Sequence, residues 1–128
     1  ERQGIRVMAF ADDPSALYSA ADLAVARAGA MTTAELCWFR LPSVLVPYPY
    51  AAGDHQRGNA GELESAGGAV MLDQDAAGKS LWPLVESLLE EPERRRGMST
   101  ALAGLMPENP AYAIARRLLN TAGEGGGL

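Results

Sequence analysis

The stretch that decides the fold is ADLAVARAGAMTTAEL, residues 21–36. Residues 22–26 form a short, mostly apolar run that is typical of a buried strand, and residues 31–39 have the pattern of a helix. The turn between them holds small residues, which let the main chain approach a ligand closely. A strand that leads through such a turn into a helix predicts an α/β domain with an anion site at that helix N-terminus.

Outward from this stretch, apolar runs and helical patterns alternate in both directions. Further strands are predicted over residues 5–9, 43–46 and 69–72, and further helices over residues 14–20, 54–66, 80–90, 92–105 and 110–120. This alternation predicts a Rossmann-like parallel sheet with flanking helices and right-handed crossovers. Ligands bind beyond the carboxyl ends of the strands in such sheets, so site residues are expected after residues 9, 26, 46 and 72.

Capping residues and glycines set the predicted boundaries. Asp54 is expected to cap the helix over residues 54–66, which Gly67 and Gly68 end, and Ser80 is expected to cap the helix over residues 80–90. Residues 1–120 are expected to form one partial nucleotide-binding domain. The glycine-rich residues 121–128 are expected to form a flexible tail.

Composition restricts the class of protein. The 128 residues suit a single domain, and the net charge of −5 argues against a nucleic-acid-binding surface. No run approaches about 18 apolar residues, so no membrane-spanning helix is expected. The one cysteine, Cys37, permits no internal disulfide and suits a reducing, cytoplasmic compartment. Because the first residue is Glu1 and not Met, the chain is expected to be a fragment or a processed product.

The first candidate site is the turn and helix N-terminus at residues 27–35. Free N–H groups and the positive end of the helix dipole suit a phosphate or diphosphate. Glu35 has two interpretations. The local pattern favours a capping box, in which Thr32 is the N-cap and Glu35 binds the N–H of that cap. In the other interpretation, the carboxylate of Glu35 accepts hydrogen bonds from a ribose diol.

The second candidate site is the polar segment at residues 47–60. Gln56 and Asn59 are three residues apart on one helix face, and their amides suit sugar hydroxyls. His55 is the only histidine, and the sequence offers no second metal ligand at a suitable spacing, so no metal site is expected. Residues 78–80 read GKS, but Asp73 stands where a phosphate loop needs glycine, so that motif is broken.

Three segments together resemble the C-terminal, donor-binding domain of the MurG glycosyltransferases. They are FADD at residues 10–13, the stretch at residues 21–36, and LPSVLVP at residues 41–47 followed by DHQRGNA at residues 54–60. The resemblance extends over residues 4–120. It implies the C-terminal half of a GT-B glycosyltransferase, truncated at its N-terminus. The missing N-terminal domain would bind the lipid-linked acceptor and supply the catalytic base.

The resemblance also implies an activity. MurG-type enzymes are hexosyltransferases that transfer N-acetylglucosamine from UDP-N-acetylglucosamine (UDP-GlcNAc) to lipid I with inversion, which makes lipid II for peptidoglycan synthesis. This implies a part in cell-wall biogenesis, cell shape, the cell cycle and cell division. It also implies a cytoplasmic protein that is membrane-associated at the inner face of the plasma membrane. No cofactor is implied, and the chain alone is expected to be inactive.

The resemblance assigns a role to each site residue and places no catalytic residue in this chain. Uracil would lie against the main chain of Ala11 with Phe10 nearby, and the ribose hydroxyls would bind Glu35, which shifts the interpretation of that residue towards ligand binding. His55 and Gln56 would contact the sugar, and Asn59 would hold that loop or the donor. The diphosphate would be lined by Gly29, Ala30, Met31 and Thr32.

Two departures from the family affect these roles. Ala28 stands where relatives carry serine or another small residue, so any hydroxyl contact there is lost, and His55 stands where some relatives have glutamine. Two other functions remain open: the donor-binding module of a split glycosyltransferase, and a related lipid or natural-product glycosyltransferase. Both would be inactive without an acceptor-binding partner. A truncated sheet leaves an exposed edge, so self-association is also expected.

Overall fold

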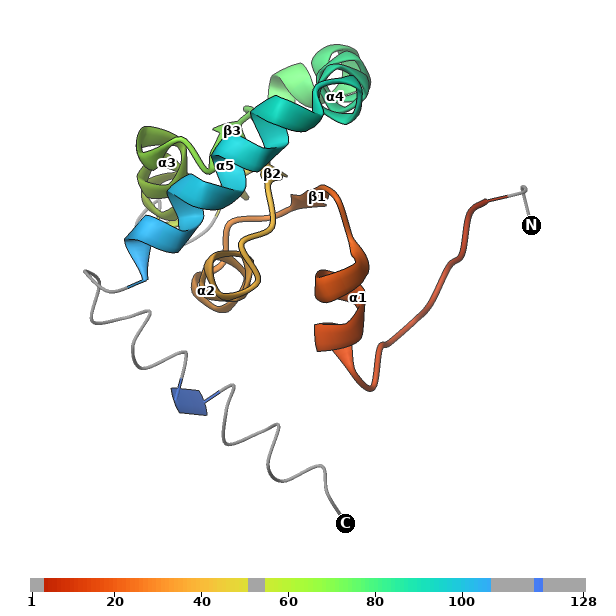
Figure 1. Cartoon of the computed structure of the whole chain (residues 1–128). Coiled ribbons are helices and arrows are strands. Elements are labelled where there is room, and N and C mark those ends of the chain that lie inside the picture. The colour runs from red at the N-terminus through yellow and green to blue at the C-terminus, as the bar shows by residue number, and fades with distance from the viewer. Residues whose placement is uncertain (1–3, 51–54, 107–116, 119–128) are drawn as a thin grey trace.

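The computed structural model describes residues 4–50, 55–106 and 117–118 (Figure 1). Its centre is a three-stranded parallel sheet in the order β1-β2-β3, formed by β1 (Ala24–Ala26), β2 (Ser43–Leu45) and β3 (Ala69–Met71). Val25 pairs in register with Val44, and Val44 with Val70. The predicted α/β class and parallel sheet are confirmed, with each strand slightly shorter than its apolar run.

Within residues 4–50 and 55–106, five helices flank this sheet. They are α1 (Pro14–Ala20), α2 (Ala30–Trp38), α3 (His55–Ala66), α4 (Gln74–Glu90) and α5 (Pro92–Leu105). Proline is the first residue of both α1 and α5, where a missing N–H costs nothing. Asp13 caps α1, because its carboxylate accepts a hydrogen bond from the N–H of Ser15 at 3.1 Å. The sequence-based bounds of α1 and α5 are confirmed.

The two faces of the sheet have different coverings. On one face, Leu45 and Ala69 pack with buried residues of α2, α3 and α5, among them Leu36, Leu63 and Leu102. On the other face, Val44 packs with Leu88 of α4 and Met98 of α5, and Val70 is half-buried against the same cluster. Alternate residues of a strand point to opposite faces, which is why nearly all-apolar strands suit this two-sided core.

Gly67 and Gly68 end α3, as predicted. Gly67 has a φ of +91°, a conformation that favours glycine, and the N–H of Gly68 donates to the carbonyl of Leu63 at 2.9 Å. Asp54, the predicted cap of α3, lies outside the described residues. The two glycines turn the chain directly into β3, so that the carboxyl end of β3 lies at the same edge of the sheet as those of β1 and β2.

Two sequence-based predictions are wrong. Residues 5–9 form no strand: Ile5 and Val7 are exposed, and Figure 1 shows this segment running away from the sheet. A strand needs a neighbour for its main-chain hydrogen bonds, and an apolar run does not supply one. Helix α4 begins at Gln74, so Ser80 lies inside it and is no cap. Pro83 within α4 is exposed, where the carbonyl that it leaves without a donor can be solvated.

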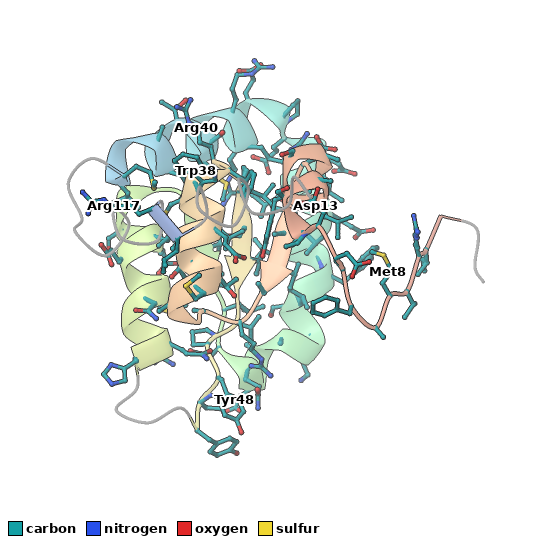
Figure 2. All side chains as sticks on the ribbon, turned by 90° about the horizontal axis from the view of Figure 1, so that it is seen from below. Met8, Asp13, Trp38, Arg40, Tyr48 and Arg117 are labelled. Atoms are coloured by element: carbon teal, nitrogen blue, oxygen red, sulfur yellow. The ribbon has the colours of Figure 1, made fainter. Side chains whose placement is uncertain are left out.

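The predicted helix over residues 110–120 lies outside the described residues except for Arg117 and Leu118, which are helical. The predicted tail at residues 121–128 also lies outside them. Figure 2 shows how α2 runs through the molecule: Trp38 and Arg40, at its carboxyl end, lie at the opposite end from Tyr48, which follows β2. The strand ends and the start of α2 therefore share one end of the molecule.

Candidate functional site

The three parallel strands finish at the same end of the sheet, and the two candidate segments meet at that end. The side-chain oxygen Oε1 of Gln56 accepts hydrogen bonds from the N–H of Tyr48, at 2.8 Å, and from the N–H of Ala28, at 3.3 Å. Asn59 Nδ2 donates to the carbonyl of Ala28 at 2.9 Å. Two side chains from the first turns of α3 therefore hold the turn after β1 and the segment after β2.

The side chains that make these contacts, Gln56 and Asn59, are ones to which the resemblance gives a part in donor binding. The hydrogen bond of Asn59 reaches the turn after β1 and not the segment of His55 and Gln56, and its expected contact with the donor stays a prediction. The Oε1 atom of Gln56 is occupied by main-chain donors, so a sugar would meet its Nε2 group. Half-buried Gln56 and Asn59 lie on the inner side of α3, whereas His55 is exposed at the first residue of that helix.

Helix α2 begins at Ala30, and Gly29 is its N-cap, with a φ of −64° and no capping side chain. The hydroxyl Oγ1 of Thr33 donates to the carbonyls of Gly29 and Ala30, both at 3.1 Å, and so fixes the position of these carbonyls in the turn. The first N–H groups of a helix have no acceptor within the helix. Ala30 and Met31 are exposed, and Gly29 and Thr32 half-buried, so the start of α2 is open to an anion.

The capping-box interpretation of Glu35 is wrong. The N-cap is Gly29, so Thr32 already lies in the first turn, and Glu35 is one turn too far along α2 to reach the cap. The Oε2 atom of Glu35 instead accepts a hydrogen bond of 2.7 Å from the phenol of Tyr18 in α1. Burial raises the pKa of Tyr18 to about 12, assisted by that hydrogen bond and by the charge of Glu35.

Arg27 is a cation at this edge to which the sequence analysis gave no role. Its Nη1 atom donates to the carbonyl of Val46, at 3.3 Å, and of Pro47, at 3.4 Å, and its guanidinium lies 5.6 Å from the centre of the Tyr48 ring. These contacts hold an exposed positive charge beside the segment that follows β2. The signal in the sequence was an arginine directly after a strand in an acidic chain.

Tyr18 is the second residue that the sequence analysis missed. It lies in α1, away from both candidate segments, and no motif includes it. Its approach to Glu35 depends on how α1 packs on α2, where its ring stacks on that of Phe39 with the ring centres 5.3 Å apart.

A cavity of about 470 Å³ opens beside the start of α4, and its lining includes Pro47, Arg57 and Gln74. Arg57 pairs with Asp73, the residue that precedes α4. The Oε1 atom of Gln74 is buried without a hydrogen-bond partner in the described part of the chain. The third strand end therefore contributes polar groups to the same edge.

Phe10 and Ala11 lie just before α1, with the Phe10 side chain 81% exposed and Ala11 half-buried. A flat, exposed ring can stack on a base. Within residues 4–50, 55–106 and 117–118, no group of three or more His, Cys, Asp or Glu side chains is arranged to hold a metal ion. No helix in this part of the chain has the length and apolar character to cross a membrane.

Comparison with known proteins shows relatives of this chain. A protein from Desulfitobacterium hafniense (strain Y51), named UDP-N-acetylglucosamine--N-acetylmuramyl-(pentapeptide) pyrophosphoryl-undecaprenol N-acetylglucosamine transferase, is 44% identical over 95% of this chain and 33% of its own length. A protein of the same name from Methylococcus capsulatus (strain ATCC 33009 / NCIMB 11132 / Bath) is 41% identical over 92% of this chain and 34% of its own. The chain thus spans about a third of the length of these relatives.

A solved structure shows the same fold. The crystal structure of Acinetobacter baumannii MurG superposes on 90% of this chain, and on 33% of that protein, with a TM-score of 0.74 and 27% identity. Residues 1–118 match the family described as the glycosyltransferase family 28 C-terminal domain. The chain therefore belongs to the family of glycosyltransferase family 28 C-terminal domains.

Proposed function

We propose that this chain is the UDP-GlcNAc-binding part of an inverting glycosyltransferase that converts lipid I to lipid II in peptidoglycan synthesis. One observation carries the proposal: Gln56 and Asn59 of α3 hold the turn that leads into α2. This brings the two segments with the implied diphosphate and sugar residues to one sheet edge. The names of the relatives agree with the donor and with the lipid-linked acceptor.

The donor is proposed to lie across the strand ends. Uracil lies against Phe10 and Ala11, the ribose against Glu35, and the sugar against His55 and Gln56, with Asn59 behind the loop. The diphosphate lies at the open turn of Gly29, Ala30, Met31 and Thr32. The α2 dipole and its free N–H groups stabilise the charge that develops on the UDP leaving group.

The catalytic base and the binding site for the lipid acceptor are proposed to lie outside these 128 residues. Catalysis in this part of the enzyme then consists of positioning the donor and stabilising the leaving group. Because lipid I is anchored in a membrane, the enzyme works as a peripheral protein at the cytoplasmic face of the plasma membrane. Its product serves cell-wall growth and thereby cell shape and division.

A binding measurement tests the proposal. Calorimetric titration of the chain with UDP-GlcNAc and UDP is compared with that of Glu35→Ala. Loss of hydrogen bonds to a charged group should weaken UDP binding about tenfold or more. Glu86→Ala, which removes an exposed carboxylate from α4, is the control. Equal UDP affinity in Glu35→Ala and the wild type would contradict the ribose assignment, and a preference for UDP-glucose or a TDP-sugar would contradict the donor.

Self-association through the edge of the sheet is a further part of the proposal. In the described part of the chain, β1 pairs with β2 and with no other strand. The Val25 side chain of β1 is 48% exposed. An unpaired edge strand with an exposed apolar side chain is suited to pairing with the same strand of a second copy.

A further inference from the structure

The phenol of Tyr18 and the carboxylate of Glu35 form a contact that joins two helices at the proposed ribose site. The hydroxyl group of Tyr18 donates to Oε2 of Glu35 at 2.7 Å, within the usual range for a hydroxyl on a carboxylate. Both side chains are half-buried. The donor lies in α1 and the acceptor in α2, seventeen residues further along the chain.

The Tyr18 ring is itself fixed. It lies on the ring of Phe39 with the two planes 17° apart, and Phe39 directly follows the last residue of α2. The phenol oxygen therefore has a defined position relative to α2, although it comes from another helix. Figure 2 shows Asp13, the cap of α1, on the side of the molecule where α1 packs.

A free glutamate side chain on a helix samples several rotamers. A ligand that needs one of them binds less tightly, because selecting that rotamer costs conformational entropy. A phenol has one hydrogen to donate, so it fixes one oxygen of Glu35 and leaves the other oxygen free to accept. The phenol keeps that hydrogen at neutral pH, which lies far below the Tyr18 pKa of about 12.

We propose that Tyr18 is a positioning residue for the donor nucleotide: it holds Oε2 of Glu35 so that the carboxylate faces the ribose hydroxyls. This inference rests on the proposed function, because it takes the ribose as the ligand of Glu35. If the hydrogen bond between α1 and α2 served only the fold, its loss would lower the affinity for every ligand of the proposed site equally. Positioning of Glu35 affects only ligands that carry ribose hydroxyls.

The test compares UDP with 2′,3′-dideoxy-UDP, which lacks both hydroxyls, by calorimetric titration of the 128-residue chain at pH 7.5. The wild type should bind UDP about tenfold or more tightly than the dideoxy compound. Tyr18→Phe keeps the stacked ring and removes only the hydroxyl. It should lower this ratio about three- to tenfold while the affinity for dideoxy-UDP stays within about twofold.

Glu35→Gln, alone and combined with Tyr18→Phe, completes a double-mutant cycle. It should lower the ratio by itself, and adding Tyr18→Phe to it should have no further effect on the ratio, because the two residues act through one contact. An unchanged ratio in Tyr18→Phe, with a lowered ratio in Glu35→Gln, overturns the positioning role and leaves the donor site intact. Equal losses for both ligands, or a Tyr18→Phe chain that no longer melts cooperatively, assign Tyr18 to the fold and also overturn it. A wild type that does not distinguish the two ligands overturns the proposed function itself.

Discussion

The amide of Gln56 divides its hydrogen bonds between the fold and the proposed ligand. Its oxygen accepts from the N–H groups of Ala28 and Tyr48, which belong to the segments after two different strands. Both N–H groups would otherwise lack an acceptor at a loop, which is costly where water is partly excluded. A sugar that binds here therefore meets a side chain whose orientation the protein has already fixed.

Gly29 offers a test of the diphosphate position at the scale of one residue. A Cβ at this position would have no atom of the chain within 4 Å, and its φ of −64° suits any residue. Gly29→Ala should lower the free energy of unfolding by no more than about 1 kcal/mol, because alanine is a poorer N-cap residue than glycine. It should weaken UDP binding about tenfold, because the methyl group occupies space that the diphosphate needs.

The control for Gly29→Ala is Gly97→Ala, an exposed position in α5 with equally open surroundings. Urea denaturation and calorimetric titration of both variants measure the two effects separately. Undiminished UDP affinity in Gly29→Ala would show that the diphosphate does not approach the start of α2.

The pKa of Tyr18 gives a second prediction at this scale. The chain has four tyrosines, and burial next to Glu35 raises the pKa of Tyr18 to about 12. In an absorbance titration at 295 nm, one tyrosine should ionise near pH 12, and Tyr18→Phe should remove that component. A Tyr18→Phe variant that instead loses a component near pH 10 would contradict the burial of this phenol.

The raised pKa has a defined consequence for stability. The folded state binds the phenol proton more tightly than the unfolded state, whose tyrosines ionise near pH 10. Between about pH 10 and pH 12 the unfolded state therefore holds fewer protons, and the free energy of unfolding falls as pH rises. The contribution is fully present below pH 10 and is lost through the folded-state pKa of about 12.

At the scale of elements, local sequence was a sound guide wherever the local signal and the tertiary contacts agree. Proline at the first helical position predicted the starts of α1 and α5, and the glycine pair predicted the end of α3. The start of α4 was misjudged because Ser80 was taken as the cap, whereas Asp73, an equally good capping residue, is the N-cap. The α4 residues that pack in the cluster with Val44 and Val70 all follow Ser80, so this packing does not determine where the helix begins.

The junction between α3 and β3 provides the prediction at this scale. A Cβ on Gly68 would overlap Cγ and Cδ2 of Leu102, which is fully buried in α5. Gly68→Ala should therefore lower the free energy of unfolding by about 1–3 kcal/mol through overpacking. Gly78→Ala, on the exposed side of α4 with nothing nearby, should raise it by up to about 1 kcal/mol.

Urea denaturation of these two glycine variants measures both changes. The opposite signs make the comparison informative, since both substitutions add the same methyl group. Equal effects would mean that Leu102 yields without cost and that α5 is not packed tightly on the α3–β3 junction.

At the scale of the whole molecule, the covering of the sheet is uneven. Helix α4 packs over Val44 and Val70, but Val25, which shares their face, stays half exposed at the edge strand. The sheet therefore presents both an unpaired edge and an uncovered apolar side chain within the described part of the chain.

This arrangement predicts that the chain associates with itself in solution. Sedimentation velocity over a range of concentrations should show a reversible dimer or larger species. Val25→Lys should shift the population to the monomer, because a lysine on an edge strand opposes pairing with a second edge. The control is Leu89→Lys, which places a lysine on the exposed side of α4. Val85 is avoided because its side chain packs in the core. A wild type that sediments as a monomer at all concentrations would contradict the prediction.

The sequence by itself predicted the α/β class, the parallel sheet, most helix bounds and the two candidate segments at the strand ends, because these depend on local periodicity, prolines, glycines and strand ends. The resemblance of residues 21–36 and 54–60 to a family added the donor and the residue roles. Only the tertiary structure decided what Glu35 contacts, what Gln56 holds and whether residues 5–9 pair with a strand. Each of these depends on a partner distant in sequence, such as Tyr18 for Glu35, and a local pattern carries no information about which distant group packs against it.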